Sequence, residues 1–338
     1  PQVMASAPYA APVGTEVTIS TSGDILAHSP VFKAAKVKGG YDFRPLLAGI
    51  KSLLTADVNF CHLETPLSKK APTGFPLFHT PVQMAVAIKS AGFHGCSVSS
   101  NHSLDAGIDS VFLTKRTMLA AGLQTAGSRL TANDSAIGWY TTTKGVRVAQ
   151  LAYTFGFNGI PRPKGKEWAL NLINAKAIIA AAKAARLAGA QLVIVNLHWG
   201  TEYIDKPTSY QKNLAKILTA SPYIDGLIGQ HAHVIQDAVI MNGKPVIYGT
   251  GNLLSNQGPW AGMKNGQHGV IVTLKFRVGA QSAQYVSGSY VPTFVPRYTY
   301  RVAAAKTQLL SSNATEACRS VKDSAQHLSK VLTGPTKC

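Results

Sequence analysis

The sequence predicts an α/β layered fold built around a mixed β-sheet. Short apolar runs of strand character alternate with segments of helical spacing through about the first 230 residues. Two hairpin signals add antiparallel strands to this alternation, so we expect the sheet to be mixed. Apolar residues make up 46% of the chain, which is ordinary for a globular protein and argues against a disordered one.

The predicted strands are short runs of apolar and β-branched residues. They cover residues 17–22, 57–63, 95–99, 192–197 and 226–229. The run at 192–197 is almost continuously apolar, as is typical of a strand buried on both faces of a parallel sheet. Further strands are predicted between residues 269 and 303.

Two segments carry hairpin signals. Residues 138–153 turn at Lys144-Gly145, and residues 238–248 have Asn242-Gly243 at their centre. Asn-Gly favours a two-residue turn in which both residues take positive φ. We therefore expect an antiparallel pair of strands in each segment.

Five segments have the spacing of amphipathic helices. They cover residues 43–54, 82–91, 109–121, 174–187 and 211–219. Gly92, Gly122 and Gly189 stand at three helix ends, where a residue without a side chain takes positive φ. The Gly-, Pro- and Lys-rich residues 156–166 are expected to form a mobile lid. The last ~30 residues are expected to be helical or loose.

The chain is long enough for one large domain with appendages. We expect a linker at residues 1–14, a main domain at 15–275, and a β extension with a C-terminal tail at 276–338. The first residues are rich in Ala, Pro and Ser, like a linker left after removal of a signal or anchor. An exported protein, extracellular or associated with the cell envelope, is therefore expected.

The chain is strongly basic, with 33 Lys and Arg against 15 Asp and Glu and a formal net charge of +18. The basic residues occur singly or in short groups, which favours a solvated basic surface. Such a surface attracts polyanions such as cell-wall polymer, polyglutamate or phospholipid head groups. The interleaved aromatic residues of a nucleic-acid module are missing, so we expect no nucleic acid among its partners.

Four cysteines allow three pairings. Cys318 and Cys338 flank a polar tail, and we predict that they form a disulfide. Cys61 and Cys96 lie in apolar, strand-like runs, where we expect buried thiols. A bridge between neighbouring strands is the less favoured alternative for that pair.

Metal-binding residue types follow five successive strand-like runs. These residues are Asp24, Glu64, Asn101 with His102 and Asp105, His198 with Glu202, and His231 with His233. Carboxylate and amide oxygens combined with imidazoles suit Zn²⁺, Mn²⁺ or Fe. Taken singly, Asp24 would cap a helix and Asn101 would hold a turn. Taken together, the set favours a divalent metal site at the carboxyl edge of the sheet. The spacing of His231 and His233 would point both side chains the same way if the backbone is extended.

Six ordered motifs then resemble the bacterial CapA family. They are Gly-Asp at 23–24, Leu-Glu-Thr-Pro at 63–66, Asn-His-x-x-Asp-x-Gly at 101–107, His-Trp-Gly-x-Glu-Tyr at 198–203, Gly-Gln-His-x-His-Val-x-Gln at 229–236, and Tyr-Gly-Thr-Gly-Asn-Leu at 248–253. The resemblance covers roughly residues 17–255. The family is linked to poly-γ-glutamate capsule synthesis and is similar to calcineurin-like metallophosphoesterases. It implies a layered sandwich of mixed β-sheets flanked by helices, with a β-rich C-terminal extension.

The resemblance also implies roles for single residues. Glu64 stands where a carboxylate bridges two metals, and His102 stands at the position of the general acid, with Asp105 as its partner. The remaining metal ligands would be Asp24, Asn101, His198, His231 and His233. We expect substrate contacts from Trp199, Glu202, Tyr203 and Asn252. Two positions depart from the pattern: Leu26 replaces a histidine, and Cys61-His62 replaces Ala-Asn. Either one or two ions would then bind.

Three functions remain open. The first is a metal-dependent enzyme that hydrolyses or transfers an amide or phosphoester of an anionic polymer or peptide, in poly-γ-glutamate or envelope polymer metabolism. The second is a non-catalytic, polyanion-binding component of a membrane-bound polymer synthesis and export complex. The third is a peptide epimerase. The His102–Asp105 pair favours an enzyme, because a binding protein needs no proton relay.

Overall fold

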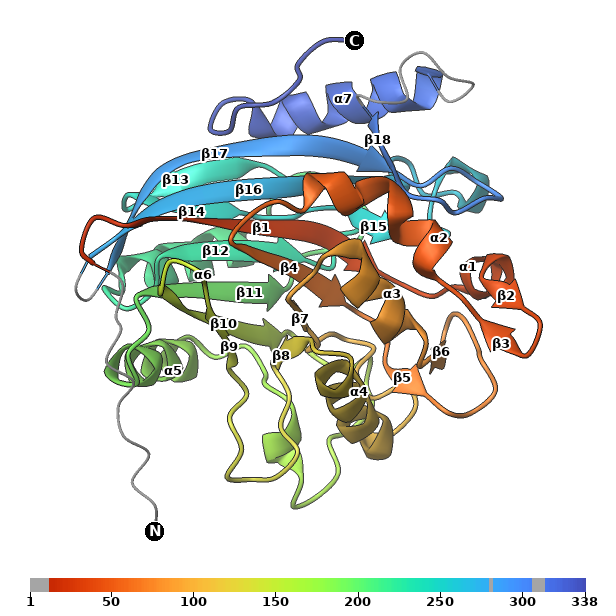
Figure 1. The fold of residues 1–338 in the computed structure, drawn as a ribbon, viewed down its shortest axis with the longest axis horizontal. Coiled ribbons are helices and arrows are strands. Elements are labelled where there is room, and N and C mark those ends of the chain that lie inside the picture. The colour runs from red at the N-terminus through yellow and green to blue at the C-terminus, as the bar shows by residue number, and fades with distance from the viewer. Residues whose placement is uncertain (1–11, 280–281, 306–313) are drawn as a thin grey trace.

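Two mixed β-sheets lie face to face, and helices cover their outer faces (Figure 1). The computed structural model describes residues 12–279, 282–305 and 314–338. Residues 1–11 of the expected linker lie outside this range. The predicted fold class, a layered sandwich of mixed sheets with C-terminal strands, is confirmed.

The first sheet has eight strands in the order β18-β17-β16-β1-β4-β7-β8, with β15 also paired to β1. Its strands are β1 (Glu16–Ile25), β4 (Val58–Leu63), β7 (Gly95–Ser97), β8 (Gln124–Ala126), β15 (Asn252–Leu254), β16 (His268–Val278), β17 (Ala283–Phe294) and β18 (Ala303–Ala304). The strands β1, β4, β7 and β8 are parallel to one another, whereas β16 and β17 run antiparallel to their neighbours. The sheet is therefore parallel on one side and antiparallel on the other.

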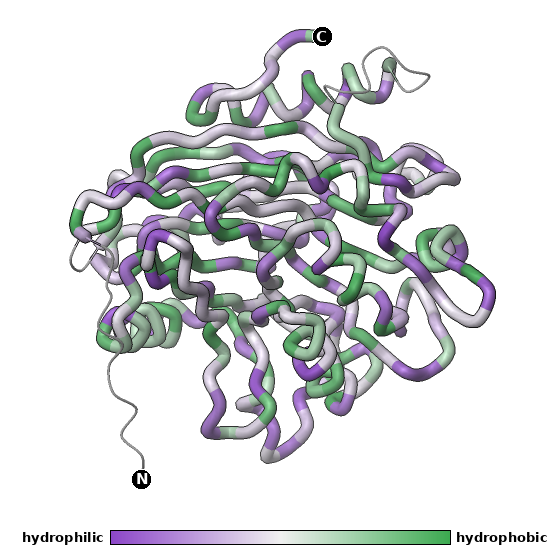
Figure 2. Tube along the Cα trace, in the orientation of Figure 1, coloured by the Kyte–Doolittle hydropathy of each residue, from purple (hydrophilic) through white to green (hydrophobic). Residues whose placement is uncertain are grey.

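The second sheet has six strands in the order β13-β14-β12-β11-β10-β9. Its strands are β9 (Gly138–Thr141), β10 (Arg147–Thr154), β11 (Leu192–His198), β12 (Gly226–Gln230), β13 (Ala238–Met241) and β14 (Lys244–Ile247). Both predicted hairpins are confirmed as β9–β10 and β13–β14. Asn242 and Gly243 take φ of 51° and 74°, as their turn requires. The strand β11 is hydrophobic along most of its length (Figure 2).

The remaining elements are helices and two small ribbons. The helices are α1 (Ser29–Ala34), α2 (Arg44–Leu47), η1 (Ala48–Leu53), α3 (Met84–Ala91), α4 (Ile108–Ala120), η2 (Glu167–Ala169), α5 (Ala175–Leu187), α6 (Ser209–Ala220), η3 (Pro259–Ala261) and α7 (Ala314–Leu328). The ribbons pair β2 (Lys36–Val37) with β3 (Gly40–Tyr41) and β5 (Leu67–Ser68) with β6 (Thr80–Pro81). The single helix predicted at 43–54 is instead a short α-helix continued by a 3-10 helix. None of the helices in the described part of the chain is both long and apolar enough to span a membrane.

Local sequence explains where two of these helices begin. The side chain of Asn174 accepts a hydrogen bond from the Ala177 N–H at the start of α5. Thr208 and Gln211 form a capping box at the start of α6, in which each side chain bonds the backbone of the other. Such caps satisfy N–H groups that the first helical turn leaves unpaired.

One part of the core lies between the two sheets, and two others lie between each sheet and the helices that cover it. Buried residues of the first sheet, among them Ile19 and Phe60, pack in one cluster with Val148, Ile194 and Ile228 of the second. Burial of each such side chain stabilises the fold by about 1.5–3 kcal/mol. This packing fixes one sheet against the other, so the carboxyl ends of β1, β4, β11 and β12 point to the same side (Figure 1).

Candidate metal centre

Glu64 lies at the centre of the site, directly after β4. Its side chain is buried, and within the described residues neither carboxylate oxygen has a hydrogen-bond partner. The closest imidazole atoms are Nε2 of His233 and Nε2 of His198, 3.7 Å and 3.8 Å from Oε1. Burial raises the pKa of Glu64 well above its usual value, although the charge of His233 acts in the opposite direction. A buried carboxylate without hydrogen bonds is costly unless a cation neutralises it.

Asp24 supplies a second carboxylate from the end of β1. Its Oδ2 accepts a hydrogen bond from the backbone N–H of His231 at 3.0 Å and lies 3.3 Å from Nδ1 of His233. Its Oδ1 is buried and has no partner among the residues that the structure describes. A side chain at Gly23 would overlap the Gly251 carbonyl, so glycine is required for β1 to pass β15 at this point. Asp24 therefore holds the histidine loop with one oxygen and leaves the other available.

His231 and His233 lie in the loop after β12, and their backbone is left-handed. Their φ values are 90° and 56°, so the extended backbone considered from their spacing is not formed. Each non-glycine residue in this conformation costs on the order of 1–3 kcal/mol, which the surrounding contacts must offset. As a result, His231, His233 and Glu64 each place one possible ligand atom within 4.8 Å of the other two. A tight loop, and not strand alternation, brings them together.

A second group forms around the same carboxylate. His62, Glu64 and His198 place one ligand atom each within 4.8 Å of one another. Asn101 joins it, since its Oδ1 lies 2.8 Å from Nε2 of His198. The sequence interpretation did not assign His62 to the site. The available signal was its place two residues before Glu64 in a strand, which puts both side chains on one face.

The imidazoles of the cluster differ in charge. Burial lowers the pKa of His62 to about 4 and, together with neighbouring histidines, holds the pKa values of His198 and His231 well below the usual range. Burial acts in the same direction on His233, but Glu64 and Asp24 outweigh it and raise its pKa to about 9. Three rings are thus neutral at pH 7, with lone pairs available to a cation.

His102 and Asp105 form a closely bonded pair beside this cluster. Nδ1 of His102 lies 2.6 Å from Oδ2 of Asp105, which also accepts a hydrogen bond from the Phe78 N–H at 2.9 Å. Asn158 belongs to the Gly-, Pro- and Lys-rich loop, which the sequence interpretation expected to be a lid. Its side chain accepts a hydrogen bond from Asn101 at 3.1 Å and lies 3.4 Å from His102. Asn158 is a further residue that sequence reasoning did not assign to the site.

A cavity of about 270 Å³ opens next to the cluster. Its lining includes His102 and His233, two of the four expected substrate-contact residues (Glu202 and Tyr203), and the apolar residues Leu26, Phe75, Phe78 and Met263. The Tyr203 hydroxyl accepts a hydrogen bond from the Gln257 side chain at 2.9 Å. The cavity is thus lined by both polar and apolar side chains.

The other two expected substrate contacts, Trp199 and Asn252, do not line this cavity. Trp199 is fully buried between α6 and the second sheet, and its indole N–H donates to the Tyr248 carbonyl at 3.0 Å. Asn252 is also buried, and its Oδ1 lies 3.0 Å from Nδ1 of His233. In this structure Trp199 packs in the core, Asn252 contacts a histidine of the cluster, and their contacts with a substrate stay predictions.

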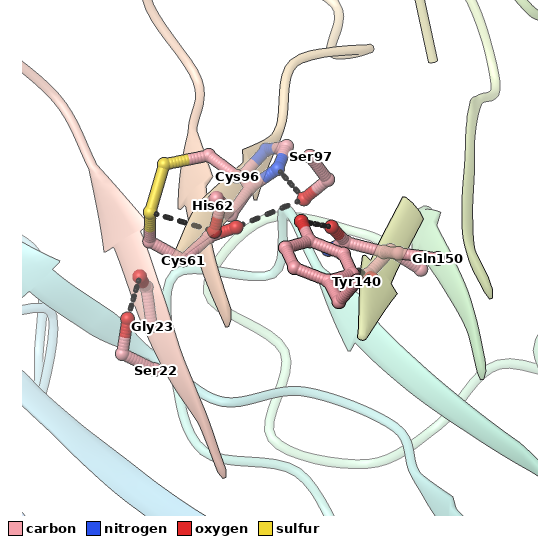
Figure 3. Close-up of a disulfide and its surroundings, with 10 residues drawn as sticks. Ser22, Gly23, Cys61, His62, Cys96, Ser97, Tyr140 and Gln150 are labelled. Carbon is pink, nitrogen blue, oxygen red and sulfur yellow. Dashed lines mark hydrogen bonds between the residues drawn. A yellow bond between two sulfur atoms is a disulfide. The ribbon is translucent and has the colours of Figure 1, made fainter. Parts of the chain in front are cut away.

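A disulfide lies directly beside the cluster, and it corrects the cysteine prediction. Cys61 and Cys96 face each other in register on β4 and β7, with Cα atoms 4.3 Å apart, and they are bridged (Figure 3). The two thiols lie in separate strand-like runs whose register the sequence did not show. The predicted bridge between Cys318 and Cys338 is formed.

The fold and this cluster define the chain as a protein with a metallophosphoesterase-like fold. The 5'-nucleotidase precursor from Thermus thermophilus superposes on 92% of this chain and 59% of its own length, with a TM-score of 0.53 and 11% sequence identity. That likeness concerns the fold alone. Residues 18–257 match the family described as bacterial capsule synthesis protein PGA_cap, and the chain belongs to this family.

Two relatives carry names that agree with this family. The capsule biosynthesis protein CapA of Bacillus anthracis is 31% identical over 242 residues, which are 70% of this chain and 54% of that protein. The PGA biosynthesis protein CapA of Bacillus subtilis (strain 168) is 26% identical over 173 residues, or 51% of this chain and 45% of that protein. The chain thus spans about half the length of both relatives. The resemblance to the CapA family is confirmed.

Proposed function

We propose that this chain is a metal-dependent enzyme that hydrolyses or transfers an amide or phosphoester bond in an anionic polymer or peptide of the cell envelope. The observation that carries the proposal is the buried, unbonded carboxylate of Glu64, which faces imidazoles and adjoins a cavity that contains His102. Poly-γ-glutamate is the substrate that the family and its resemblance suggest. A non-catalytic, polyanion-binding component of a polymer synthesis complex is the alternative.

The donor set fits a divalent cation. Buried polar atoms that lack a hydrogen-bond partner in the described ranges belong to four of its residues and to the neighbouring His62. They are Oδ1 of Asp24, Nε2 of His62, both carboxylate oxygens of Glu64, Nδ1 of His198 and Nδ1 of His231. The residues expected to hold the cation are Asp24, Glu64, Asn101, His198, His231 and His233. A cation there supplies positive charge that polarises a carbonyl or phosphoryl oxygen and lowers the pKa of water. Mixed imidazole and carboxylate ligands favour Zn²⁺, Mn²⁺ or Fe.

The protein residues around the cavity would position the substrate and move a proton. Asp105 holds Nδ1 of His102, so Nε2 is the ring atom left to exchange a proton with a leaving group. Phe78 contacts the His102 ring edge-on, with ring centroids 4.8 Å apart, and restricts its rotation. His102 would then donate to the departing amine or alcohol as a general acid.

The charge and the disulfides support the setting of this proposal. A net charge of +18 attracts an anionic polymer over several ångströms of solution. Two disulfides are typical of proteins that fold in an oxidising compartment, which supports export. Extracellular or envelope-bound polymer is therefore the proposed substrate pool.

A metal and substrate screen tests the proposal. The full chain would be stripped with a chelator, reloaded with Zn²⁺, Mn²⁺ or Fe²⁺, and assayed on phosphoester and γ-glutamyl substrates. We expect protein reloaded with metal to turn over one of the two substrate classes. The stripped protein should turn over neither class. Metal-loaded protein that binds polyglutamate and turns over neither class would contradict the enzyme and favour the binding component.

His102 provides a sharper test of the chemistry. His102→Ala should lower kcat by about 10²–10⁴-fold and leave the metal content unchanged, because the residue transfers a proton and does not hold the cation. His231→Ala should lose metal and activity together. The measurements are kcat, bound metal and melting temperature of both variants. An active His102→Ala protein with normal metal and a lower melting temperature would show that His102 only braces the turn after β7.

A further inference from the structure

His62 is a buried histidine whose two ring nitrogens have different surroundings. Nδ1 lies 2.7 Å from the hydroxyl oxygen of Ser97 on the neighbouring strand β7. Nε2 is buried and has no hydrogen-bond partner in the part of the chain that the structure describes. A polar atom left unpaired in the interior costs about 1–3 kcal/mol, so a packing role alone does not account for a histidine here.

The contacts of Ser97 favour one tautomer of the His62 ring. The Ser97 hydroxyl oxygen lies 2.7 Å from Nδ1 of His62 and 3.4 Å from the carbonyl oxygen of Cys61, which offers an acceptor for its proton (Figure 3). When the hydroxyl donates to that carbonyl, Nδ1 of His62 is the donor toward the Ser97 oxygen. In the neutral ring, Nε2 is consequently left with a lone pair and no proton. This is the tautomer that a metal ligand requires, with its other nitrogen held by a protein group.

The atoms around His62 suit a cation. His62, Glu64 and His198 have ligand atoms that lie within 4.8 Å of one another, and all three side chains are buried. The His62 and His198 rings contact each other with centroids 4.8 Å apart. Two imidazoles and one carboxylate are also the protein ligands of many catalytic zinc sites.

We propose that His62 is a ligand for a divalent cation of the Zn²⁺ type, together with Glu64 and His198, and that Ser97 fixes its tautomer. The proposal rests on the metal centre of the proposed function. It adds a ligand from β4, a central strand of the first sheet. Ser97 is a positioning residue in this scheme. Glu64 is shared with the group of His231 and His233, so it would lie between the two ligand groups.

Metal binding, measured apart from turnover, tests this proposal. The full chain and its variants would be stripped with a chelator and titrated with Zn²⁺ by calorimetry and with Co²⁺ by visible absorption. His62→Gln should bind Zn²⁺ at least ~10–100-fold more weakly or lose one equivalent, and its Co²⁺ spectrum should change. Ser97→Ala should lower the affinity by ~10–100-fold, as is typical when a residue that orients a ligand is removed.

The matched control is His94→Gln. His94 precedes β7 at the opposite edge of the sheet, where its Nδ1 accepts a hydrogen bond from the Asn59 N–H. Its binding of Zn²⁺ and its Co²⁺ spectrum should equal those of the wild type. Circular dichroism would confirm that each variant is folded, and Ser97→Ala carries the test if His62→Gln does not fold.

The outcomes separate the two proposals. A folded His62→Gln or Ser97→Ala protein with wild-type affinity, stoichiometry and Co²⁺ spectrum would overturn the role of His62. A wild-type protein that binds neither Zn²⁺ nor Co²⁺ would overturn it as well. Wild-type protein that binds Zn²⁺ through His62 but turns over no substrate would contradict only the proposed enzyme.

Discussion

The side chain of Glu64 connects stability to metal binding at the scale of one residue. Without a cation it is a buried carboxylate with no hydrogen bond from the described residues, and such groups destabilise a fold. In the presence of a chelator, Glu64→Gln should therefore melt at or above the wild-type temperature. Zn²⁺ at about 100 times its Kd should raise the free energy of unfolding of the wild type, but not of the variant, by about 2.7 kcal/mol. This corresponds to a rise in melting temperature on the order of 5 °C.

Thermal unfolding with and without Zn²⁺ measures this difference. Glu167→Gln is the control, because Glu167 is an exposed carboxylate on η2 and its replacement should preserve the Zn²⁺ effect. An equal rise in melting temperature for the wild type and Glu64→Gln would show that Zn²⁺ binds elsewhere.

Two disulfides stabilise different elements of the fold. The bridge between Cys61 and Cys96 joins two central strands and spans 35 residues, whereas that between Cys318 and Cys338 spans 20 residues at the C-terminal tail. Removal of a bridge costs about 2–4 kcal/mol, and the longer loop alone adds about 0.5 kcal/mol. The double variant Cys61→Ala/Cys96→Ala should thus lose more free energy of unfolding than Cys318→Ala/Cys338→Ala.

Urea unfolding of both double variants checks this order. The m-value of each double variant should rise relative to the wild type, because an unfolded chain without the crosslink exposes more surface. A larger loss for the tail bridge would mean that the docking of α7, and not the β4–β7 pair, limits the stability of the protein.

Helix α7 lies on the first sheet and is held by a charged contact with β16. Nδ1 of His268 is 2.9 Å from Oδ2 of Asp323, and its Nε2 is 2.6 Å from Oε1 of Glu316. Burial lowers the pKa of His268, but the bonds to the two carboxylates outweigh it and raise the pKa above the usual value. Burial likewise raises the pKa of Glu316, and His268, Gln267 and Arg319 outweigh it and lower that pKa to about 2.

These shifts predict a pH window for the docking of α7. The stabilisation from His268 is complete below about pH 6.5 and is lost as the pH rises through its raised folded pKa. The stabilisation from Glu316 is complete above about pH 4.5 and is lost as the pH falls through about 2. Hydrogen exchange of the α7 amides should therefore be slowest, relative to intrinsic rates, between about pH 4.5 and 6.5. In His268→Gln, the protection of the α7 amides should no longer fall as the pH rises above about 6.5. Unchanged protection up to about pH 9 in the wild type would contradict this role of His268.

The charge of the whole molecule predicts how the proposed binding of a polyanion depends on salt. With a net charge of +18, association with poly-γ-glutamate should be largely electrostatic. The Debye length falls from about 10 Å at 0.1 M salt to about 3 Å at 1 M, so the Kd should rise at least ~10-fold over this range. Fluorescence anisotropy with labelled polymer measures it, and neutral polyglutamine is the control. Salt-independent binding would indicate recognition by the cavity alone.

Features with local causes could be predicted from the sequence. The Asn242-Gly243 turn defines its own hairpin, and the apolar run of β11 needs burial on both faces whatever surrounds it. Because ligands bind at the carboxyl ends of parallel strands, the polar residues after such runs indicated where Asp24 and Glu64 would meet.

Features that depend on register or on loop conformation could not be predicted. The bridge between Cys61 and Cys96 requires β4 and β7 to pair in one register. The sequence does not show which strands are neighbours or in which register they pair. The left-handed backbone at His231 and His233 is imposed by contacts with Asp24 and Asn252, which are distant in sequence. His62 resembled any residue of a buried strand until Ser97 was placed opposite it.

The position of the disulfide has a practical consequence for preparing the protein. Cys61 and Cys96 immediately precede His62 and Ser97 on paired strands, so the bridge and the histidine–serine contact share one register. Recombinant material made in the reducing cytoplasm would lack the disulfide next to His62, the proposed metal ligand. Batches from cytoplasmic and periplasmic expression should consequently differ in how much Zn²⁺ they retain through purification, even though their amino-acid sequences are identical.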